Sequence, residues 1–107
     1  MKIPKFVRVL GRKFTVVCVD HISLDGLVLG TCNGSEGIIT IATAAHEEPR
    51  TSVATTLLHE CLHAALHISG HTNAMSDSTE EAIVSMLTYA IEEIMPQLGK
   101  MHEEAKH

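Results

Sequence analysis

The sequence predicts an α+β fold, in which a β-rich half is followed by two helices. Residues 1–43 contain short runs of β-branched residues between glycine-containing turns, a pattern typical of a small, mostly antiparallel sheet. Residues 51–69 and 78–95 instead carry apolar side chains at helical spacing. With 107 residues, the chain has the length of one domain, so we expect residues 1–107 to form a single unit.

Four strands are expected in the first half of the chain. The runs 6–10 and 14–19 flank Gly11-Arg12-Lys13 and predict a hairpin. Further strands are expected at 27–32 and 37–42. The pair Asn33-Gly34 between them is a strong turn signal, so these strands are expected to be antiparallel neighbours.

The first helix is expected over residues 51–69. Thr51 or Ser52 follows a proline and is a suitable N-cap, and Gly70 is placed as the glycine that ends the helix. Its histidines gather on one polar face, opposite an apolar face that contains Cys61. Helix 51–69 is therefore predicted to pack on the sheet through its apolar side.

The second helix is expected over residues 78–95. Ser78 and Glu81 have the spacing of a capping box, which would account for acids at the helix start without any chemistry. Pro96 is expected to end the helix. The polar tail 97–107 is expected to be a frayed helix or disordered.

Composition limits the classes of partner. A net charge of −5 argues against a nucleic-acid-binding surface. The chain contains no apolar run of the length that a signal peptide or membrane span requires, and its three scattered cysteines form no disulfide framework. We therefore expect a cytoplasmic protein with no membrane partner, and leave its oligomeric state open.

The motif H-E-x-x-H at residues 59–63 is the centre of the functional prediction. On a helix, His59 and His63 are one turn apart and can direct two imidazoles at one zinc ion. Glu60 lies close enough to act as a general base on a water molecule held there. The alternative is an ordinary solvated helix face, but the motif sits centrally on an amphipathic helix. The sequence thus predicts zinc binding by His59 and His63, with Glu60 as the catalytic residue.

The third zinc ligand is open on spacing alone. A catalytic zinc has three protein ligands and one free position. This chain lacks the glycine and the third histidine of the extended H-E-x-x-H-x-x-G-x-x-H motif. The candidates are Glu80 and Glu81 at the start of the second helix, and His67 or His71 after the motif.

Three further residues could belong to the site or to the core. Tyr89 follows Glu81 by two helical turns, and its hydroxyl could steady a developing oxyanion or simply lie at the core edge. Cys61 is expected in the core. We assign no role to His46.

The chain resembles a known family through several segments. These are Gly30, Ile39-Thr40-Ile41, the run T-L-L-H-E-C-L-H-A at 56–64, and Glu81-Ala82. They are similar to the short zinc metallopeptidase-like proteins encoded by phages and prophages, which are relatives of the ImmA/IrrE-type peptidases on the gluzincin side of the zincins. Where the ImmA/IrrE pattern has an acid followed by Ala-Asn, this chain has Glu81-Ala82-Ile83.

The resemblance implies a minimal zincin fold, with a small sheet packed on the H-E-x-x-H helix and a second helix. It implies zinc as the cofactor and favours Glu81 as the third ligand beside His59 and His63. It implies that strand 37–42 is the sheet edge beside the cleft, where a peptide or protein substrate would add as a further strand. A phage or prophage origin in a bacterial host also follows.

Three functions are compatible with these residues. The first is a zinc metallopeptidase that hydrolyses peptide bonds with a zinc-activated water. The second is a zincin-fold zinc-binding interaction module without turnover. The third is a structural helix pair with a solvated histidine face, which would bind no metal.

Overall fold

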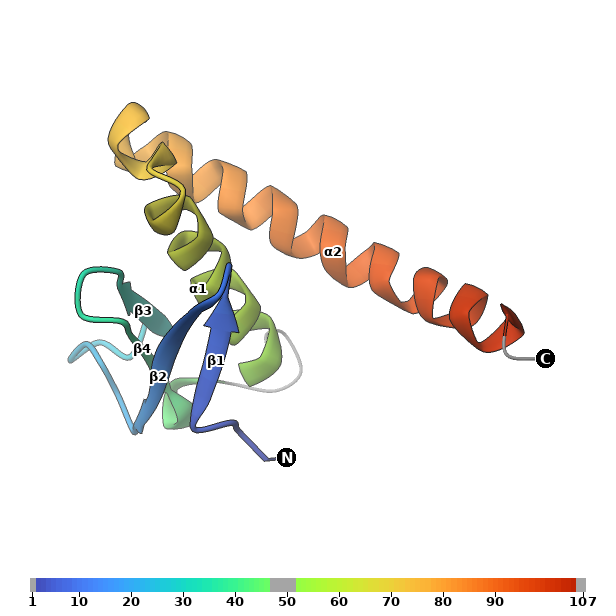
Figure 1. Ribbon diagram of the computed structural model, residues 1–107. Coiled ribbons are helices and arrows are strands. Elements are labelled where there is room, and N and C mark those ends of the chain that lie inside the picture. The colour runs from blue at the N-terminus through green and yellow to red at the C-terminus, as the bar shows by residue number, and fades with distance from the viewer. Residues whose placement is uncertain (1, 47–51, 106–107) are drawn as a thin grey trace.

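The computed structural model describes residues 2–46 and 52–105 and has the predicted α+β architecture (Figure 1). Its elements in chain order are β1 (Phe6–Val9), β2 (Arg12–Val19), β3 (Gly30–Asn33), β4 (Ile38–Ala42), the 3₁₀ turn η1 (Thr43–Ala45), α1 (Val53–Ile68), the 3₁₀ turn η2 (His71–Ala74) and α2 (Asp77–Ala105). α1 contacts both the sheet and α2, so it forms the middle layer.

β1 and β2 form the predicted antiparallel hairpin, but the turn is one residue earlier than predicted. Leu10 and Gly11 occupy it with φ angles of 48° and 83°. Two consecutive positive φ angles are the mark of a two-residue type I′ turn, which suits the twist of a hairpin. β2 therefore begins at Arg12, paired with Val9.

The sheet is mixed, with the strand order β1-β2-β4-β3. The pairs β1–β2 and β3–β4 are antiparallel, whereas the central strands β2 and β4 are parallel. The prediction that strand 37–42 forms the edge is wrong, because β4 lies between β2 and β3. β4 contains the fully buried Ile39 and Ile41, as suits a central strand, and the short, partly polar β3 forms the edge.

The core lies between the sheet and α1. Phe14, Ile39, Ile41 and Ala64 are fully buried there. Half-buried side chains complete it along α1, namely Val53, Leu57, Cys61, Ala65 and Ile68. Cys61 thus packs against the core, as predicted from its place on the helix.

Both ends of α1 follow the sequence signals. The Ser52 hydroxyl accepts a hydrogen bond from the Thr55 backbone N–H at 3.0 Å and caps the helix. Gly70 follows the helix in the left-handed region, with φ of 81°. The alternative cap Thr51 lies outside the described residues.

α2 differs from the prediction at both ends. Its cap is Ser76, whose hydroxyl accepts from the Thr79 backbone N–H at 3.2 Å, so the capping box at Ser78 and Glu81 is not the one used. The helix also continues through Pro96 to Ala105. This half of α2 stands clear of the body (Figure 1), and residues 92–101, Pro96 included, are exposed. The predicted tail 97–107 is therefore helical as far as it is described.

Within residues 2–46 and 52–105, no helix is both long enough and apolar enough to cross a membrane.

Candidate metal centre

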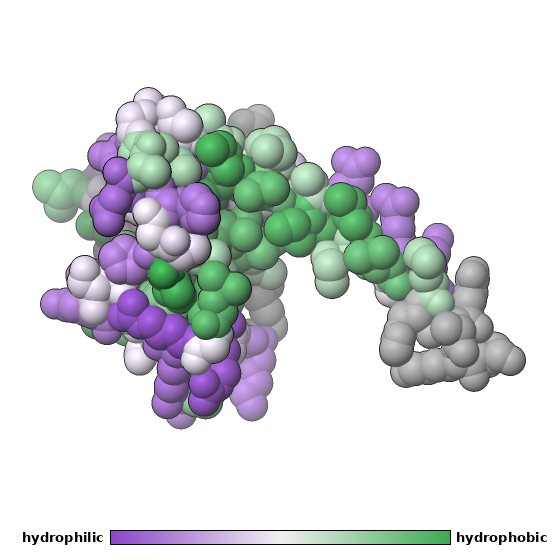
Figure 2. Space-filling model, turned by 45° about the horizontal axis from the view of Figure 1, so that its top comes forward, coloured by the Kyte–Doolittle hydropathy of each residue, from purple (hydrophilic) through white to green (hydrophobic). Residues whose placement is uncertain are grey.

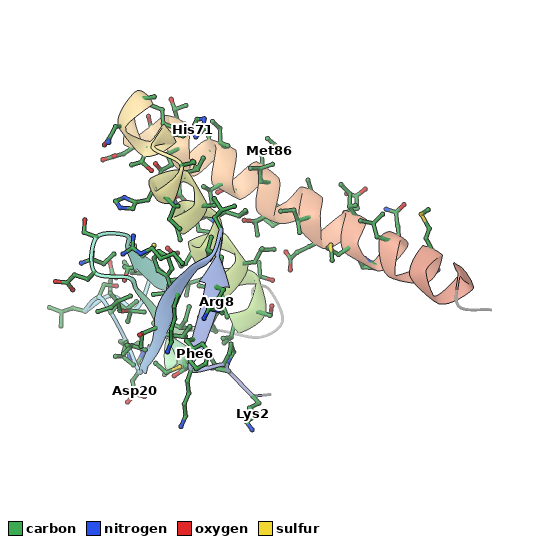
Figure 3. The ribbon with its side chains drawn as sticks, viewed as in Figure 1. Lys2, Phe6, Arg8, Asp20, His71 and Met86 are labelled. Atoms are coloured by element: carbon green, nitrogen blue, oxygen red, sulfur yellow. The ribbon has the colours of Figure 1, made fainter. Side chains whose placement is uncertain are left out.

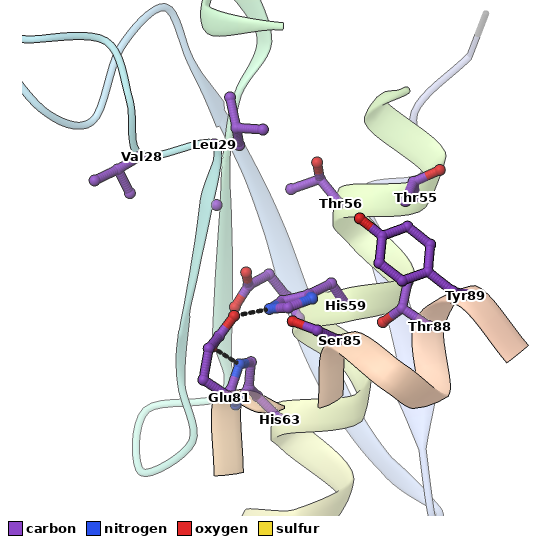
Figure 4. Close-up of a pocket in the computed structure, with 12 residues that line it drawn as sticks. Val28, Leu29, Thr55, Thr56, His59, His63, Glu81, Ser85, Thr88 and Tyr89 are labelled. Carbon is purple, nitrogen blue, oxygen red and sulfur yellow. Dashed lines mark hydrogen bonds and ion pairs between the residues drawn. The ribbon is translucent and has the colours of Figure 1, made fainter. Parts of the chain in front are cut away.

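α1, α2 and the segment leading into β3 enclose a cleft of about 380 Å³ (Figure 4). The motif residues of α1 form one wall and the first turns of α2 form another. Its lining is Val28, Leu29, Gly30, Thr55, Thr56, His59, Glu60, His63, Glu81, Ser85, Thr88 and Tyr89. The predicted site residues therefore line a cleft that is open to solvent.

The side chains of His59, His63 and Glu81 converge in this cleft (Figure 4). One Glu81 oxygen, Oε1, lies 2.8 Å from His59 Nε2, and the other, Oε2, lies 2.9 Å from His63 Nε2. One ligand atom from each residue lies within 4.8 Å of the other two, and this is the only such group of three among the described residues. α1 thus supplies two nitrogens and α2 one carboxylate to the same point.

Glu80 approaches His63 from the opposite side of the ring. Its Oε2 lies 2.6 Å from His63 Nδ1. Burial raises the pKa of the Glu80 carboxyl, but the hydrogen bond to His63 and the positive charge there outweigh it, and the net pKa is lowered. A carboxylate at Nδ1 favours a proton on that nitrogen, while Nε2 donates to Glu81 Oε2 at 2.9 Å; Nε2 can act as a ligand when a metal ion replaces its proton.

Glu80 and Glu81 therefore occupy different positions around the His63 ring. Glu81 faces Nε2 of both histidines, whereas Glu80 holds the far nitrogen of His63 alone. Burial lowers the pKa of His63. Its hydrogen bonds to Glu80 and Glu81 and the charge of Glu60 raise the pKa by more than burial lowers it, so the net shift is upward.

Glu60 is buried in the wall of the same cleft, with 6% of its surface exposed. Burial raises the pKa of its carboxyl to about 7, against the lowering effect of His63. Its carboxyl also borders a second cleft of about 330 Å³, beside Cys32 and His67. Glu60 is thus the acid placed next to the convergent trio without being part of it.

Gly30 allows the edge strand to approach α1 closely. A Cβ atom at this position would lie 2.8 Å from Thr56 Cγ2 and 3.1 Å from Glu60 Cγ. The first contact is too short for any larger residue unless the Thr56 side chain or the backbone shifts, and the second is tighter than most Cβ contacts. Gly30 therefore sets how close β3 lies to the Glu60 side chain.

Of the remaining candidates, His67 and His71 lie outside the cleft that holds the trio, and Tyr89 lies on its rim. His67 is exposed, and its ring lies over Gly34, where a Cβ atom would come within 2.4 Å of the ring. His71 lies in η2 (Figure 3) and pairs with the Ser69 hydroxyl at 2.7 Å. Tyr89 is 70% exposed on the cleft rim, so it is not a core-edge residue.

His46 has a structural place that the sequence did not reveal. Its Nδ1 lies 2.8 Å from the Ala42 carbonyl and its Nε2 lies 2.7 Å from the Thr56 hydroxyl. The carbonyl can only accept, so Nδ1 donates and Nε2 accepts from Thr56. This side chain joins the end of β4 to Thr56 of α1, one of the residues that line the cleft.

A scan against protein-family models, a search of curated proteins and a search of solved structures found no match to this chain. The geometry of the cleft is therefore the basis for the function.

Proposed function

We propose that this chain is a zinc-dependent metallopeptidase with a minimal zincin fold. The observation that carries the proposal is the convergence of His59, His63 and Glu81 on one point of a cleft that Glu60 also lines. This is the chemical inventory that an H-E-x-x-H peptidase needs: three ligands and a general base.

The donor set fits zinc. Two imidazole nitrogens and one carboxylate are a ligand combination found in catalytic zinc sites, and they leave one position open. The Glu80 carboxylate at His63 Nδ1 supports the same view, because metal-binding histidines commonly donate their other N–H to a carboxylate. We therefore assign Glu81 as the third ligand and Glu80 as the residue that orients His63.

Zinc held by this trio would act as a Lewis acid toward water and toward a peptide carbonyl. Glu60 would take the proton from the attacking water and later deliver it to the amine that leaves. Its position in the wall, beside the ligands and near Gly30, suits both transfers. Tyr89 offers a hydroxyl at the rim, where it could donate to the substrate oxygen.

The substrate is proposed to be an extended peptide or protein segment. β3 is the sheet edge, and no strand lies beyond it in the described sheet. Gly30 and the preceding Val28 and Leu29 line the cleft, so a peptide added along this edge would cross the trio. The edge strand in this proposal is β3, in place of the strand 37–42 expected from the sequence. A cytoplasmic location and a phage or prophage origin remain predictions.

Metal content tests the ligand assignment. We expect about one zinc per chain in the wild-type protein by elemental analysis, and loss of zinc in Glu81→Ala. His67→Ala is the matched control, because it removes another imidazole of α1 that lies outside the trio, and it should keep its zinc. We expect Glu80→Gln to bind zinc about 10–100-fold more weakly. Zinc retained at full affinity in Glu81→Ala would contradict the proposal.

Glu60→Gln tests turnover separately from binding. A peptidase variant should keep its zinc and lose hydrolysis of a fluorogenic peptide library, because the general base is gone. The alternative function, a zinc-binding interaction module without turnover, predicts that wild type binds zinc but cleaves nothing. A wild-type protein that takes up no metal when zinc is supplied would exclude both.

A further inference from the structure

η2, the short turn between the two helices, brings one side chain toward the metal centre. Gly70 precedes the turn in the left-handed region, and η2 packs against α1. His71, Asn73 and Ala74 are exposed, whereas Thr72 is half-buried. η2 lies at the end of the molecule that Figure 2 turns toward the viewer, where hydrophilic side chains gather on the body, apart from the apolar band along α2. Thr72 is therefore the residue of this polar turn that is drawn into the protein.

The Thr72 hydroxyl is buried without a hydrogen-bond partner of good geometry. Among the described residues that are not exposed, it is the only buried side-chain nitrogen or oxygen atom of this kind. Buried polar groups nearly always have a partner, because they lose their hydrogen bonds to water. This hydroxyl therefore calls for a polar group close by on which it acts.

The polar group beside Thr72 is the Glu80 carboxylate. Both residues line the second cleft, together with His63. Burial raises the pKa of the Glu80 carboxyl, whereas the hydrogen bond to His63 and the Thr72 hydroxyl lower it. The pKa of Glu60, which lines the same cleft, is set instead by burial, His63 and Glu81. The hydroxyl therefore acts on Glu80, and because a carboxylate can only accept, Thr72 is the donor.

Glu80 depends on protein groups to hold it in place. Its side chain is 14% exposed, whereas that of Glu81 is 56% exposed, so little water reaches Glu80. One of its oxygens, Oε2, lies 2.6 Å from His63 Nδ1. With this contact alone the carboxylate could turn, because the terminal torsion of a glutamate side chain has broad preferences. A hydroxyl on a second side of the carboxylate limits that rotation.

We propose that Thr72 is a positioning residue of the metal centre: it holds the Glu80 carboxylate, and Glu80 holds Nδ1 of His63. This inference rests on the proposed function, because it takes His63 as a zinc ligand. Thr72 is not among the residues that line the cleft of the trio, so it acts only through Glu80. The two contacts in series fix the plane of the His63 ring, and with it the direction in which Nε2 faces the metal.

Zinc affinity, measured by competition with a chromogenic chelator, tests this role. Thr72→Val removes the hydroxyl and keeps the shape of the side chain. We expect it to bind zinc about 3–10-fold more weakly, a smaller effect than that of changing a residue in contact with a ligand. Thr72→Ser keeps a hydroxyl and should bind zinc as wild type does. Thr31→Val is the matched control, because Thr31 lines the same cleft from β3, and it should leave the affinity unchanged.

A double-mutant cycle shows whether Thr72 acts through Glu80. In a Glu80→Ala background the hydroxyl has no carboxylate to hold, so Thr72→Val should weaken zinc binding no further. If Thr72 only supported the fold of η2, Thr72→Val would weaken zinc binding by the same factor in both backgrounds. Circular dichroism confirms that each variant is folded, and Thr72→Ala, which also lacks the hydroxyl, takes the place of Thr72→Val if the valine variant is not.

The outcomes separate this inference from the function on which it rests. A wild-type chain that binds no zinc would overturn both. Zinc binding by wild type, with unchanged affinity in Thr72→Val, would overturn the role of Thr72 alone and leave the zinc site standing. The same holds if Thr72→Ser is as weak as Thr72→Val, or if Thr72→Val has equal effects with and without the Glu80 carboxylate.

Discussion

The Glu60 carboxyl allows a quantitative test of how deeply the site is buried. Burial raises its pKa from 4.5 to about 7 in the metal-free protein, although His63 acts in the opposite direction. Between pH 4.5 and pH 7, the folded chain therefore keeps a proton that the unfolded chain has released. The contribution of Glu60 to the free energy of unfolding therefore falls as the pH rises through this window, because the folded state binds this proton more tightly than the unfolded state does.

The size of this effect follows from the shift. A rise from 4.5 to about 7 corresponds to about 3 kcal/mol. Glu60→Gln keeps the shape of the side chain and removes the ionisation. We therefore expect wild type and variant to have similar stability near pH 5, and the variant to be more stable by about 3 kcal/mol at pH 8.5. Other titrating groups are present in both proteins and largely cancel, except His63, whose pKa the Glu60 charge raises.

Urea denaturation followed by circular dichroism, with a chelator present, measures this difference. With a urea m-value of about 1–3 kcal/mol/M, the two midpoints should separate by 1 M or more at pH 8.5. Stability curves that run parallel from pH 5 to pH 8.5 would refute the reasoning, because they would mean that the Glu60 carboxylate is solvated in the folded protein.

Three further predictions concern glycines and cysteines. Gly30→Ala should lower the free energy of unfolding by about 1–3 kcal/mol in urea titrations, because its Cβ would overlap Thr56, and an unchanged midpoint would argue against the close approach of β3. Gly99→Ala meets no neighbour within 4 Å and should raise helix content by circular dichroism, with a gain of up to about 1 kcal/mol, so a loss of helicity would contradict it. At pH 8, iodoacetamide should label the exposed Cys18 first, because burial raises the pKa of the Cys32 thiol to about 11 and also raises that of Cys61. Mass spectrometry would identify the labelled residue, and labelling of Cys32 before Cys18 would contradict this prediction.

Local signals in the sequence were sufficient for most of the fold. The hairpin, the Ser52 cap and Gly70 are each encoded within a few residues, and α1 agrees with its predicted range to within two residues. The parallel pairing of β2 with β4 is a contact between distant segments, and no turn or periodicity encodes it. Strand 37–42 was wrongly predicted to be the edge of the sheet because this distant pairing could not be foreseen.

Pro96 shows a different limit of local reasoning. A proline usually ends a helix because it lacks an N–H and crowds the carbonyl four residues earlier. Here Glu92, whose carbonyl loses its partner, and Pro96 itself are both exposed, so water can take the place of the missing N–H. Whether a proline breaks a helix thus depends on surroundings that the sequence does not state.

The candidate site was predictable in part. The spacing of His59, Glu60 and His63 places them on one helix face, and the structure puts all three along the cleft. Glu80 and Glu81 are neighbours in sequence, so spacing could not separate their places. They differ only in which nitrogen of His63 each carboxylate reaches.

Polar contacts attach α2 to α1 at two separate points. Near one end, the Thr55 hydroxyl donates to Glu92 Oε2 at 2.6 Å, and near the other, Glu80 and Glu81 hold His63. A slide of one helix along the other by a single turn, about 5.4 Å, would break both attachments together. The register between the helices is therefore fixed when the chain folds. The loss of conformational entropy that brings Glu81 to the histidines occurs during folding and not when a ligand binds.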